Sequence, residues 1–397
     1  MGIPRFRVDR SLLLLLLFLP LLVESAGCRQ RPWTLWNSYA AHFIDGQGRV
    51  IDPRAGDHST SEGQAYALFF ALTDNDRATF DRVLNWTTSN MAGGDLEKHL
   101  PGWLWGKNKD GAWTTLDTNS AADADVWMAY TLVEAGRLWQ APLYGSLGRS
   151  MMDHIAQTEV ADLPGFGMML LPGPSGFQHD RSPSLHSWTL NPSYLPLFIF
   201  ERLAVVDPGG PWQKIALNIP RLLQQSAVHG YAMDWVEYLP GDGFYPTTAH
   251  PAQEGKPAEI PLGSYDAIRV YLWAGMLDEN HRRRTEMLGA VPAMSAYLAQ
   301  HDAPPEKISD VGIPLAQDGP VGFSAALLPY LRAFPHQEKP VVTQMIRLSL
   351  QKNTATGLYG KDQGYYDQNL ALFASGFLEG RFHFGEGGVL NVEWTRA

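Results

Sequence analysis

The sequence predicts an all-α fold, an (α/α)6 barrel of six helix hairpins with short β-hairpin insertions. Apolar residues recur at helical spacing in about twelve segments along the chain. These segments come in close pairs joined by short turns such as residues 73–75. Longer connections rich in Gly and Pro separate one pair from the next. A helix pair repeated six times is typical of an α/α toroid.

The boundaries of the expected helices follow from the Gly, Pro and Asn residues that interrupt the apolar pattern. We expect helices near residues 33–45, 62–73, 76–92, 121–139, 142–158, 192–206, 211–227, 264–277, 279–301, 321–334, 338–352 and 364–378. Turn residues between short apolar runs predict β-hairpins at 103–117, 233–246 and 381–394.

Composition indicates a packed globular protein with a neutral partner. Of the 397 residues, 45% are hydrophobic and 18% charged, and no linker divides the chain, so residues 28–397 are expected to form a single domain. The net charge of −10 argues against nucleic acid or an anionic membrane face as partner. The 13 Trp residues suit either a core or the flat face of a sugar, and core packing is the ordinary explanation for any one of them.

The N-terminus has the pattern of an export signal. Basic residues precede the apolar run 12–23, and small residues follow it, so residues 1–27 are predicted to be a signal peptide and the protein to be periplasmic. Secretion or a lipid anchor are the alternatives. The single cysteine, Cys28, excludes an internal disulfide, and a membrane becomes a partner only if Cys28 is lipidated.

Four of the expected helices begin with chemically notable side chains: Glu62, Asp123, Tyr194 and Asp266. They are spaced by about 60–70 residues, roughly one helix pair, so a six-fold toroid would bring them to the same end of the barrel. Acids near a helix start also cap it or complement its dipole, and that explanation suffices for any one of them.

Two features favour a functional role for the acids as a group. Ser61 and Ser264 are available as helix caps, which would leave Glu62 and Asp266 free. Arg269 follows Asp266 by three residues, within reach on the same helical face, where it could hold that carboxylate ionised.

Other chemistries lack their motifs. The sequence contains no H-E-x-x-H, no cysteine cluster, no G-x-S-x-G elbow and no phosphate-binding glycine loop, so neither a metal nor another cofactor is expected. A carboxylate pair beside aromatic side chains is the usual equipment for hydrolysing a glycosidic bond.

Around these acids the sequence resembles glycoside hydrolase family 8. The matching blocks are TSEGQAYALFFALTDNDRATFDRVLNWT (60–87), WLWG (103–106), DTNSAADADVWMAYTLVEAGRLW (117–139), NPSYLP (191–196), SYDAIRVYLWAGM (264–276) and GPVGFSAALLPYL (319–331). The resemblance implies an (α/α)6 barrel, an inverting mechanism, no metal and a β-1,4-glucan chain as substrate. It is closest to the periplasmic endoglucanases of bacterial cellulose synthase systems, which makes the cellulose synthase complex a possible partner.

The resemblance also implies roles for individual residues. Glu62 would be the general acid, Asp266 the general base and Asp123 the residue that holds the sugar at the cleavage point, with Tyr265 and Arg269 supporting Asp266. Candidate sugar platforms, each with core packing as its alternative, are Trp103, Trp105, Trp127, Tyr194 and Trp235. Family members commonly carry Ser or Thr at the position of Ala122, and often Ser-Tyr-Gly where this chain has Ala65-Tyr66-Ala67. These departures put the rate and the fine choice of substrate in question.

Three alternatives remain open at the level of sequence. The same catalyst could act on xylan or chitosan. A polysaccharide lyase would need a basic cleft for uronates, which the acidic chain disfavours. A non-catalytic glucan-binding subunit would keep the aromatic platforms but would not need all three carboxyl groups.

Overall fold

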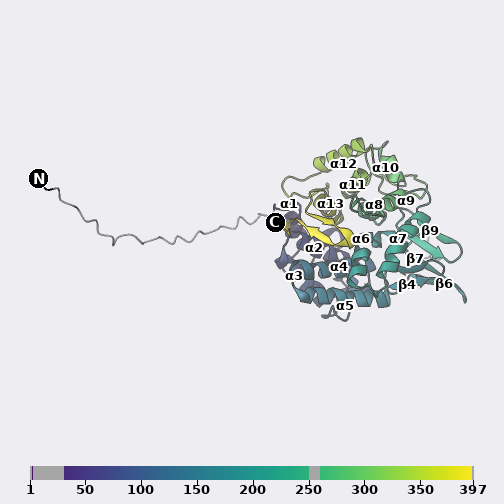
Figure 1. Ribbon diagram of the computed structural model, residues 1–397, viewed down its shortest axis with the longest axis horizontal. Helices are drawn as coiled ribbons and strands as arrows, with labels where there is room; N and C mark the ends of the chain where they lie inside the picture. Colours follow the sequence, from purple (N-terminus) through teal and green to yellow (C-terminus); the bar gives the residue numbers. More distant parts are fainter. Residues whose placement is uncertain (1, 3–30, 250–259, 396–397) are drawn as a thin grey trace.

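The computed structural model describes residues 2, 31–249 and 260–395 (Figure 1). The predicted signal peptide, residues 1–27, and Cys28 lie outside this part, apart from Gly2. The described chain forms the predicted (α/α)6 barrel. The inner helices are α2 (Ser61–Thr73), α4 (Ala122–Leu138), α6 (Leu197–Val206), α8 (Ala267–Gly275), α11 (Val321–Arg332) and α13 (Tyr365–Leu378). The outer helices are α1 (Thr34–Phe43), α3 (Arg77–Met91), α5 (Pro142–Thr158), α7 (Trp212–Ser226), α9 (Arg284–Ala290), α10 (Ala293–Leu298) and α12 (Glu338–Leu350).

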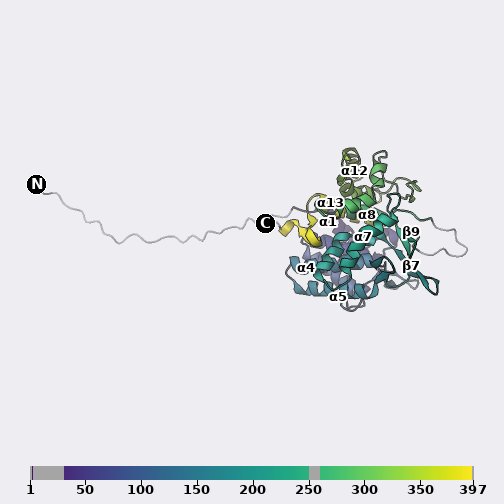
Figure 2. The same ribbon diagram turned by 45° about the vertical axis from the view of Figure 1, so that its right-hand side comes forward.

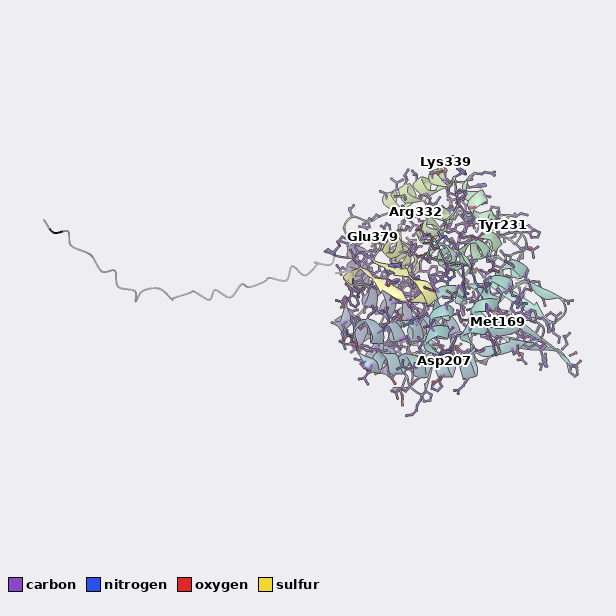
Figure 3. The ribbon with its side chains drawn as sticks, in the orientation of Figure 1. Met169, Asp207, Tyr231, Arg332, Lys339 and Glu379 are labelled. Carbon is purple, nitrogen blue, oxygen red and sulfur yellow. The ribbon has the colours of Figure 1, made fainter. Side chains whose placement is uncertain are left out.

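The two rings differ in how much of each helix is covered. In α2 every residue except Glu62 is buried, and α11 is buried from Val321 to Leu331. A helix that is apolar all round can only be stable inside such a core. By contrast, α12 buries only Pro340 and Gln344. Lys339 on that helix lies at the edge of the molecule (Figure 3). The inner helices are therefore held by packing along most of their length.

Short antiparallel strands fill the longer connections. The three predicted hairpins are present as β2 (Gly102–Lys107) with β3 (Trp113–Ser120), β8 (Trp235–Leu239) with β9 (Gly243–Thr247), and β10 (Phe382–Phe384) with β11 (Leu390–Val392). The strand β1 (Ser59–Thr60) pairs with β2 immediately before α2. Two hairpins were missed, namely β4 (Val160–Leu163) with β5 (Gly167–Leu170) and β6 (Gln178–Ser182) with β7 (Leu185–Leu190). Figures 1 and 2 show β7 and β9 projecting together from one side of the barrel.

One of the missed hairpins, that of β6 and β7, lacked a clear local signal. The strand β6 is polar and exposed, so it shows no alternation of apolar and polar residues. It pairs with β7, and β7 pairs with β8, far along the chain, which gives a four-stranded sheet in the order β6-β7-β8-β9. The partner in space, rather than the local sequence, makes these segments strands.

Three of the expected helices begin or divide differently, two of them at a proline. The segment 279–301 is two helices, α9 and α10, separated at Pro292. The segment 192–206 begins as a short 3-10 turn (Pro192–Tyr194), and α6 begins only after Pro196. The backbone before a proline is disfavoured in the helical region, which explains both interruptions. The third, 264–277, begins later, at Ala267.

Ion pairs and hydrogen bonds connect residues 31 and 32, which precede α1, with the segment that follows α13. Arg31 Nε lies 2.8 Å from a carboxylate oxygen of Glu393, and Arg381 donates to the carbonyl oxygens of Arg31 and Pro32 at 2.9 and 3.0 Å. These contacts attach the segment before α1 to the C-terminal hairpin. None of the helices within residues 31–249 and 260–395 is long and apolar enough to cross a membrane.

Inner helices approach most closely where glycine replaces a side chain. A Cβ atom on Gly275 of α8 would lie 2.3 Å from the backbone nitrogen of Tyr330 in α11. Gly289 in α9 has no atom within 4 Å of the same position. The first glycine is required by packing, and the second is not.

We therefore expect Gly275→Ala to lower the free energy of unfolding by about 1–3 kcal/mol, because backbone on the facing helix must move. Gly289→Ala is the matched control and should leave stability equal or higher, since Ala favours helix over Gly by about 1 kcal/mol. Chemical denaturation of both variants measures the difference. Equal stability of the two would contradict the close packing of α8 on α11.

Candidate active site

The acids predicted to converge meet around a single guanidinium. Glu62 lies in the first turn of α2, Asp123 in the first turn of α4, and Asp266 directly before α8. Arg269 Nη1 donates to Glu62 Oε2 and, at 2.9 Å, to Asp123 Oδ2, while its Nη2 donates to Asp266 Oδ1 at 2.6 Å. Nη1 also donates to the hydroxyl of Tyr66 at 2.9 Å. Three segments distant in sequence thus share one buried cation.

The helix caps differ from the prediction, although their consequence is as expected. The residue that caps α2 is Thr60, whose hydroxyl accepts from Gly63 N at 3.1 Å, because Ser61 is already inside the helix. Ser264 does not cap α8 either. The first helical N–H, that of Ala267, is taken by Asp234 at 2.8 Å. Both Glu62 and Asp266 therefore keep their carboxylates free for other contacts.

The residues after Glu62 fix the start of α2. A Cβ atom on Gly63 would lie 2.0 Å from the hydroxyl of Tyr365, so only glycine lets α13 approach here. The Gln64 amide accepts from Val50 N at 2.6 Å and donates to Thr87 Oγ1 at 2.8 Å. These buried contacts leave the direction of the Glu62 side chain little freedom.

The carboxyl groups of Glu62 and Asp266 differ in their protonation. Burial raises the pKa of Glu62 to about 8, and the charges of Asp123 and Asp266 act in the same direction, outweighing the opposing effect of Arg269. Burial also raises the pKa of Asp266, but only to about 6, because Arg269 and the amide of Asn191 favour its charged form. Near neutral pH one carboxyl therefore carries a proton while the other is ionised, the division that acid–base catalysis requires.

Aromatic side chains border this cluster. Trp103 is 38% exposed and, with Thr60, His58 and Tyr365, lines a cavity of about 230 Å³ next to the start of α2. Tyr265 is 41% exposed, and its hydroxyl donates to Glu306 at 2.9 Å.

Two further candidate platforms, Tyr194 and Trp235, lie close to Arg269 and to each other. The Arg269 guanidinium carbon is 5.7 Å from the centre of the Tyr194 ring, which in turn lies 6.2 Å from the ring of Trp235. The rings of Trp235 and Phe177 are parallel at 6.2 Å. Exposed and half-buried rings thus lie near the carboxyl groups.

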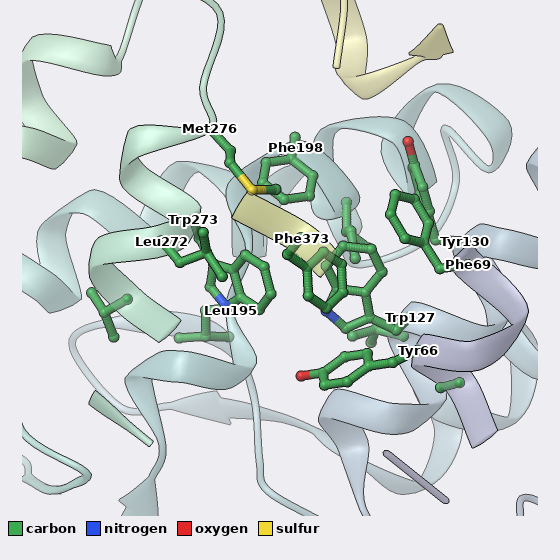
Figure 4. Close-up of a cluster of buried hydrophobic side chains, with 14 of the residues drawn as sticks. Tyr66, Phe69, Trp127, Tyr130, Leu195, Phe198, Leu272, Trp273, Met276 and Phe373 are labelled. Atoms are coloured by element: carbon green, nitrogen blue, oxygen red, sulfur yellow. The ribbon is translucent and has the colours of Figure 1, made fainter. Parts of the chain in front are cut away.

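Two of the predicted sugar platforms are wrong. Trp127 is 1% exposed and packs against Tyr66, Phe69 and Phe373 in the core, which Figure 4 shows. Because α4 is an inner helix, side chains of the neighbouring helices cover every face of the Trp127 ring. Trp105 is 8% exposed, stacked on Trp113 with ring centres 5.0 Å apart, and offers no open face.

Three residues near the acids escaped the sequence prediction. Tyr66 contacts Arg269 directly, Asp234 binds the segment that carries Asp266, and the hydroxyl of Tyr366 donates to the carbonyl oxygen of Tyr265 at 2.5 Å. Tyr366 could have been found, because it begins α13 as the predicted acids begin their own inner helices. No local pattern marks Asp234, which precedes a strand.

Comparison with known proteins identifies relatives along most of the chain. The profile of the family Glycosyl hydrolases family 8 matches residues 6–379. The chain is 43% identical to an endoglucanase of Xanthomonas axonopodis pv. citri over 95% of this chain and 93% of the relative. It is 39% identical to an endoglucanase of Escherichia coli K12, over 98% and 97% of the two chains. The crystal structure of an endo-1,4-D-glucanase from Vibrio fischeri matches with a TM-score of 0.80 and 36% identity, covering 92% of this chain and all of the other.

The raised pKa of Glu62 has a consequence for stability. A carboxyl that binds its proton more tightly in the folded state loses stability when it ionises, so this contribution falls as pH rises from about 4.5 to about 8. We expect Glu62→Gln to raise the melting temperature at pH 8 by roughly 1–2 °C, as about 1 kcal/mol would in a chain of this length. At pH 4 the two proteins should melt alike. Scanning calorimetry at both pH values, with the exposed-site variant Glu97→Gln as control, tests this, and an unchanged melting temperature at pH 8 would contradict it.

Proposed function

The chain belongs to glycosyl hydrolase family 8, and from this membership we propose that it is an endo-β-1,4-glucanase that hydrolyses cellulose-type chains with inversion at the anomeric carbon. The observation that carries the proposal is the single guanidinium of Arg269, which binds Glu62, Asp123 and Asp266 together. An inverting hydrolase needs one protonated and one ionised carboxyl on opposite faces of the sugar.

In the proposed reaction the carboxyl groups of Glu62 and Asp266 act together in a single displacement. Glu62, protonated near neutral pH, gives its proton to the glycosidic oxygen as the bond to the anomeric carbon breaks. Asp266, ionised, takes a proton from a water molecule whose oxygen forms the new bond at that carbon. Both carboxyls then return to their starting states by exchanging protons with solvent. Activity should therefore rise as Asp266 ionises near pH 6 and fall as Glu62 ionises near pH 8.

Asp123 would hold the sugar between these groups. One of its oxygens accepts from Arg269 Nη1 and the other from its own neighbour, Ala124 N, at 2.8 Å, so the carboxylate is fixed in place. A fixed carboxylate can accept hydrogen bonds from sugar hydroxyl groups without losing side-chain entropy on binding.

The proposal of inversion rests on the family to which the chain belongs. A retaining enzyme places its nucleophile within about 5–5.5 Å of the acid, whereas an inverting one leaves room for a water molecule between them. Exposed Trp103 and Tyr265 supply faces on which pyranose rings of a long chain could stack.

We further propose that the enzyme works in the periplasm, where it would cut glucan chains beside a cellulose synthase complex. The support is the N-terminal pattern of basic residues, an apolar run and small residues, together with exposed aromatic faces at Trp103 and Tyr265 that suit a neutral polymer.

The carboxyl groups give the decisive test. Glu62→Gln keeps the shape of the side chain but cannot deliver a proton, and Asp266→Asn deprives the water of its base. Each variant should lose about 10²–10⁴-fold or more in kcat on soluble cellulose while retaining binding of long oligosaccharides. Parallel assays on xylan and chitosan identify the polymer.

Proton NMR of the first product should show the α-anomer released from a β-linked chain. Initial formation of the β-anomer, or a glycosyl group trapped on Asp266, would replace the inverting mechanism with a double displacement. Wild-type protein that binds cellulose without cutting it would instead indicate a binding subunit.

The export proposal is tested by the mature N-terminus. Protein recovered from the periplasm should begin near residue 27 or 28. If Cys28 is lipidated, wild type should fractionate with membranes and Cys28→Ser should be soluble. Full-length protein retained in the cytoplasm would contradict the export signal.

A further inference from the structure

Asp234 binds the backbone on both sides of Asp266 although it lies on a different element. It directly precedes β8 and is 8% exposed. Its Oδ1 accepts from Ser264 N at 2.7 Å and from Ala267 N at 2.8 Å, and its Oδ2 accepts from the Ser264 hydroxyl at 2.5 Å. Its own N–H donates to the carbonyl oxygen of Leu262 at 2.9 Å. One carboxylate thus holds the whole turn that presents Tyr265 and Asp266.

These contacts replace the cap that α8 would otherwise need. Asp266 occupies the N-cap position of α8, yet its side chain makes no capping hydrogen bond. An aspartate at this position ordinarily turns its carboxylate back onto the first N–H groups of the helix. Here the next two helical N–H groups, those of Ile268 and Arg269, donate to the carbonyl oxygens of Ser264 and Asp266 at 3.0 Å each. Asp234 takes the first N–H, that of Ala267, so the Asp266 carboxylate points instead to Arg269.

Thr60 acts in the same way at the start of α2. Its hydroxyl accepts from Gly63 N, which leaves Glu62 in the first turn without a capping task. The difference is that Thr60 is a neighbour of Glu62 in sequence, whereas Asp234 reaches α8 from the sheet. Asp234 also carries charge, so it influences Asp266 electrostatically as well as geometrically.

Asp266 is surrounded by charged and titratable groups from every element packed against it. These are Arg269 on its own helix, Glu62 on α2, Asp123 on α4, Asn191 and Tyr194 around the 3-10 turn, Asp234 before β8, and Tyr366 on α13. The negative charges of Asp234 and Asp123 raise the pKa of Asp266, and the positive charge of Arg269 lowers it. Removing the Asp234 charge should therefore make Asp266 easier to ionise.

Resting on the proposed function, we propose that Asp234 is a positioning residue for the general base: it takes the backbone N–H groups flanking Tyr265–Asp266 and thereby reserves the Asp266 carboxylate for the reacting water. It touches neither substrate nor water itself. Its effect is exerted through the geometry and charge of Asp266.

Two substitutions separate geometry from charge. Asp234→Asn keeps an oxygen that can accept from Ser264 N and Ala267 N but removes the charge. We expect its kcat to stay within about threefold of wild type, while the acid limb of the pH–kcat profile moves down by roughly 1 pH unit. Asp234→Ala removes both acceptors, and its kcat should fall about 10²-fold with KM changed less than threefold, because a small displacement of a catalytic group is this costly.

Asp76→Ala is the matched control, because Asp76 caps the outer helix α3 by accepting from Thr79 N at 3.0 Å. It should lower the melting temperature without changing kcat. If Asp234→Ala behaves in the same way, with kcat and the acid limb as in wild type, Asp234 is only a structural cap and the proposal is wrong.

The pKa of Asp266 can also be followed by carboxyl NMR without any substrate. It should be lower in Asp234→Asn than in wild type. This readout separates the two proposals: a wild type inactive on β-1,4-glucan overturns the proposed function alone, whereas an unchanged Asp266 pKa in Asp234→Asn overturns the coupling of Asp234 to the base.

Discussion

The ion cluster around Arg269 is the constraint on which the rest of the site depends. A buried guanidinium is costly to desolvate, and three carboxyl groups offset that cost by accepting hydrogen bonds from its two terminal nitrogens. Because there are three acids and one cation, not all of the acids can be ionised cheaply. The structure resolves this competition by burial, which leaves Glu62 as the group that keeps its proton and Asp266 as the one that releases it more readily.

The barrel makes this cluster possible because it gathers helix starts at one end. Helix N-termini favour negative charge, so acids placed there stabilise their own helices as well as the site. The usual conflict is that a capping carboxylate is no longer available for chemistry. Here the two tasks are divided, since Thr60 and Asp234 satisfy the helix N–H groups while Glu62 and Asp266 face Arg269. The same separation of tasks explains why Gly63 and Gln64, which have no chemistry of their own, surround the acid: they fix the backbone from which it projects.

Aromatic residues divide between two uses according to the ring of helices that carries them. Trp127 and Phe373 fill the centre of the barrel, where inner helices cover them completely (Figure 4). Trp103 and Tyr265 stand in the connections before or between helices and keep an open face. Open aromatic faces suit the flat face of a sugar ring, so under the proposed function the connections, rather than the helices, would determine which polymer binds.

The sequence by itself determined the helix pairs, three of the hairpins and the identity of the acids that converge, because each rests on a local pattern: apolar periodicity, turn residues or a charged residue at a helix start. Even the Asp266–Arg269 contact followed from the three-residue spacing on one helix. The tertiary structure alone decided that Arg269 also binds Glu62 and Asp123, that Trp127 is core and that Asp234 caps α8 from the sheet. These contacts join residues far apart in the chain, so no local pattern encodes them; only the packing of the inner helices and of β8 brings their partners within hydrogen-bonding distance.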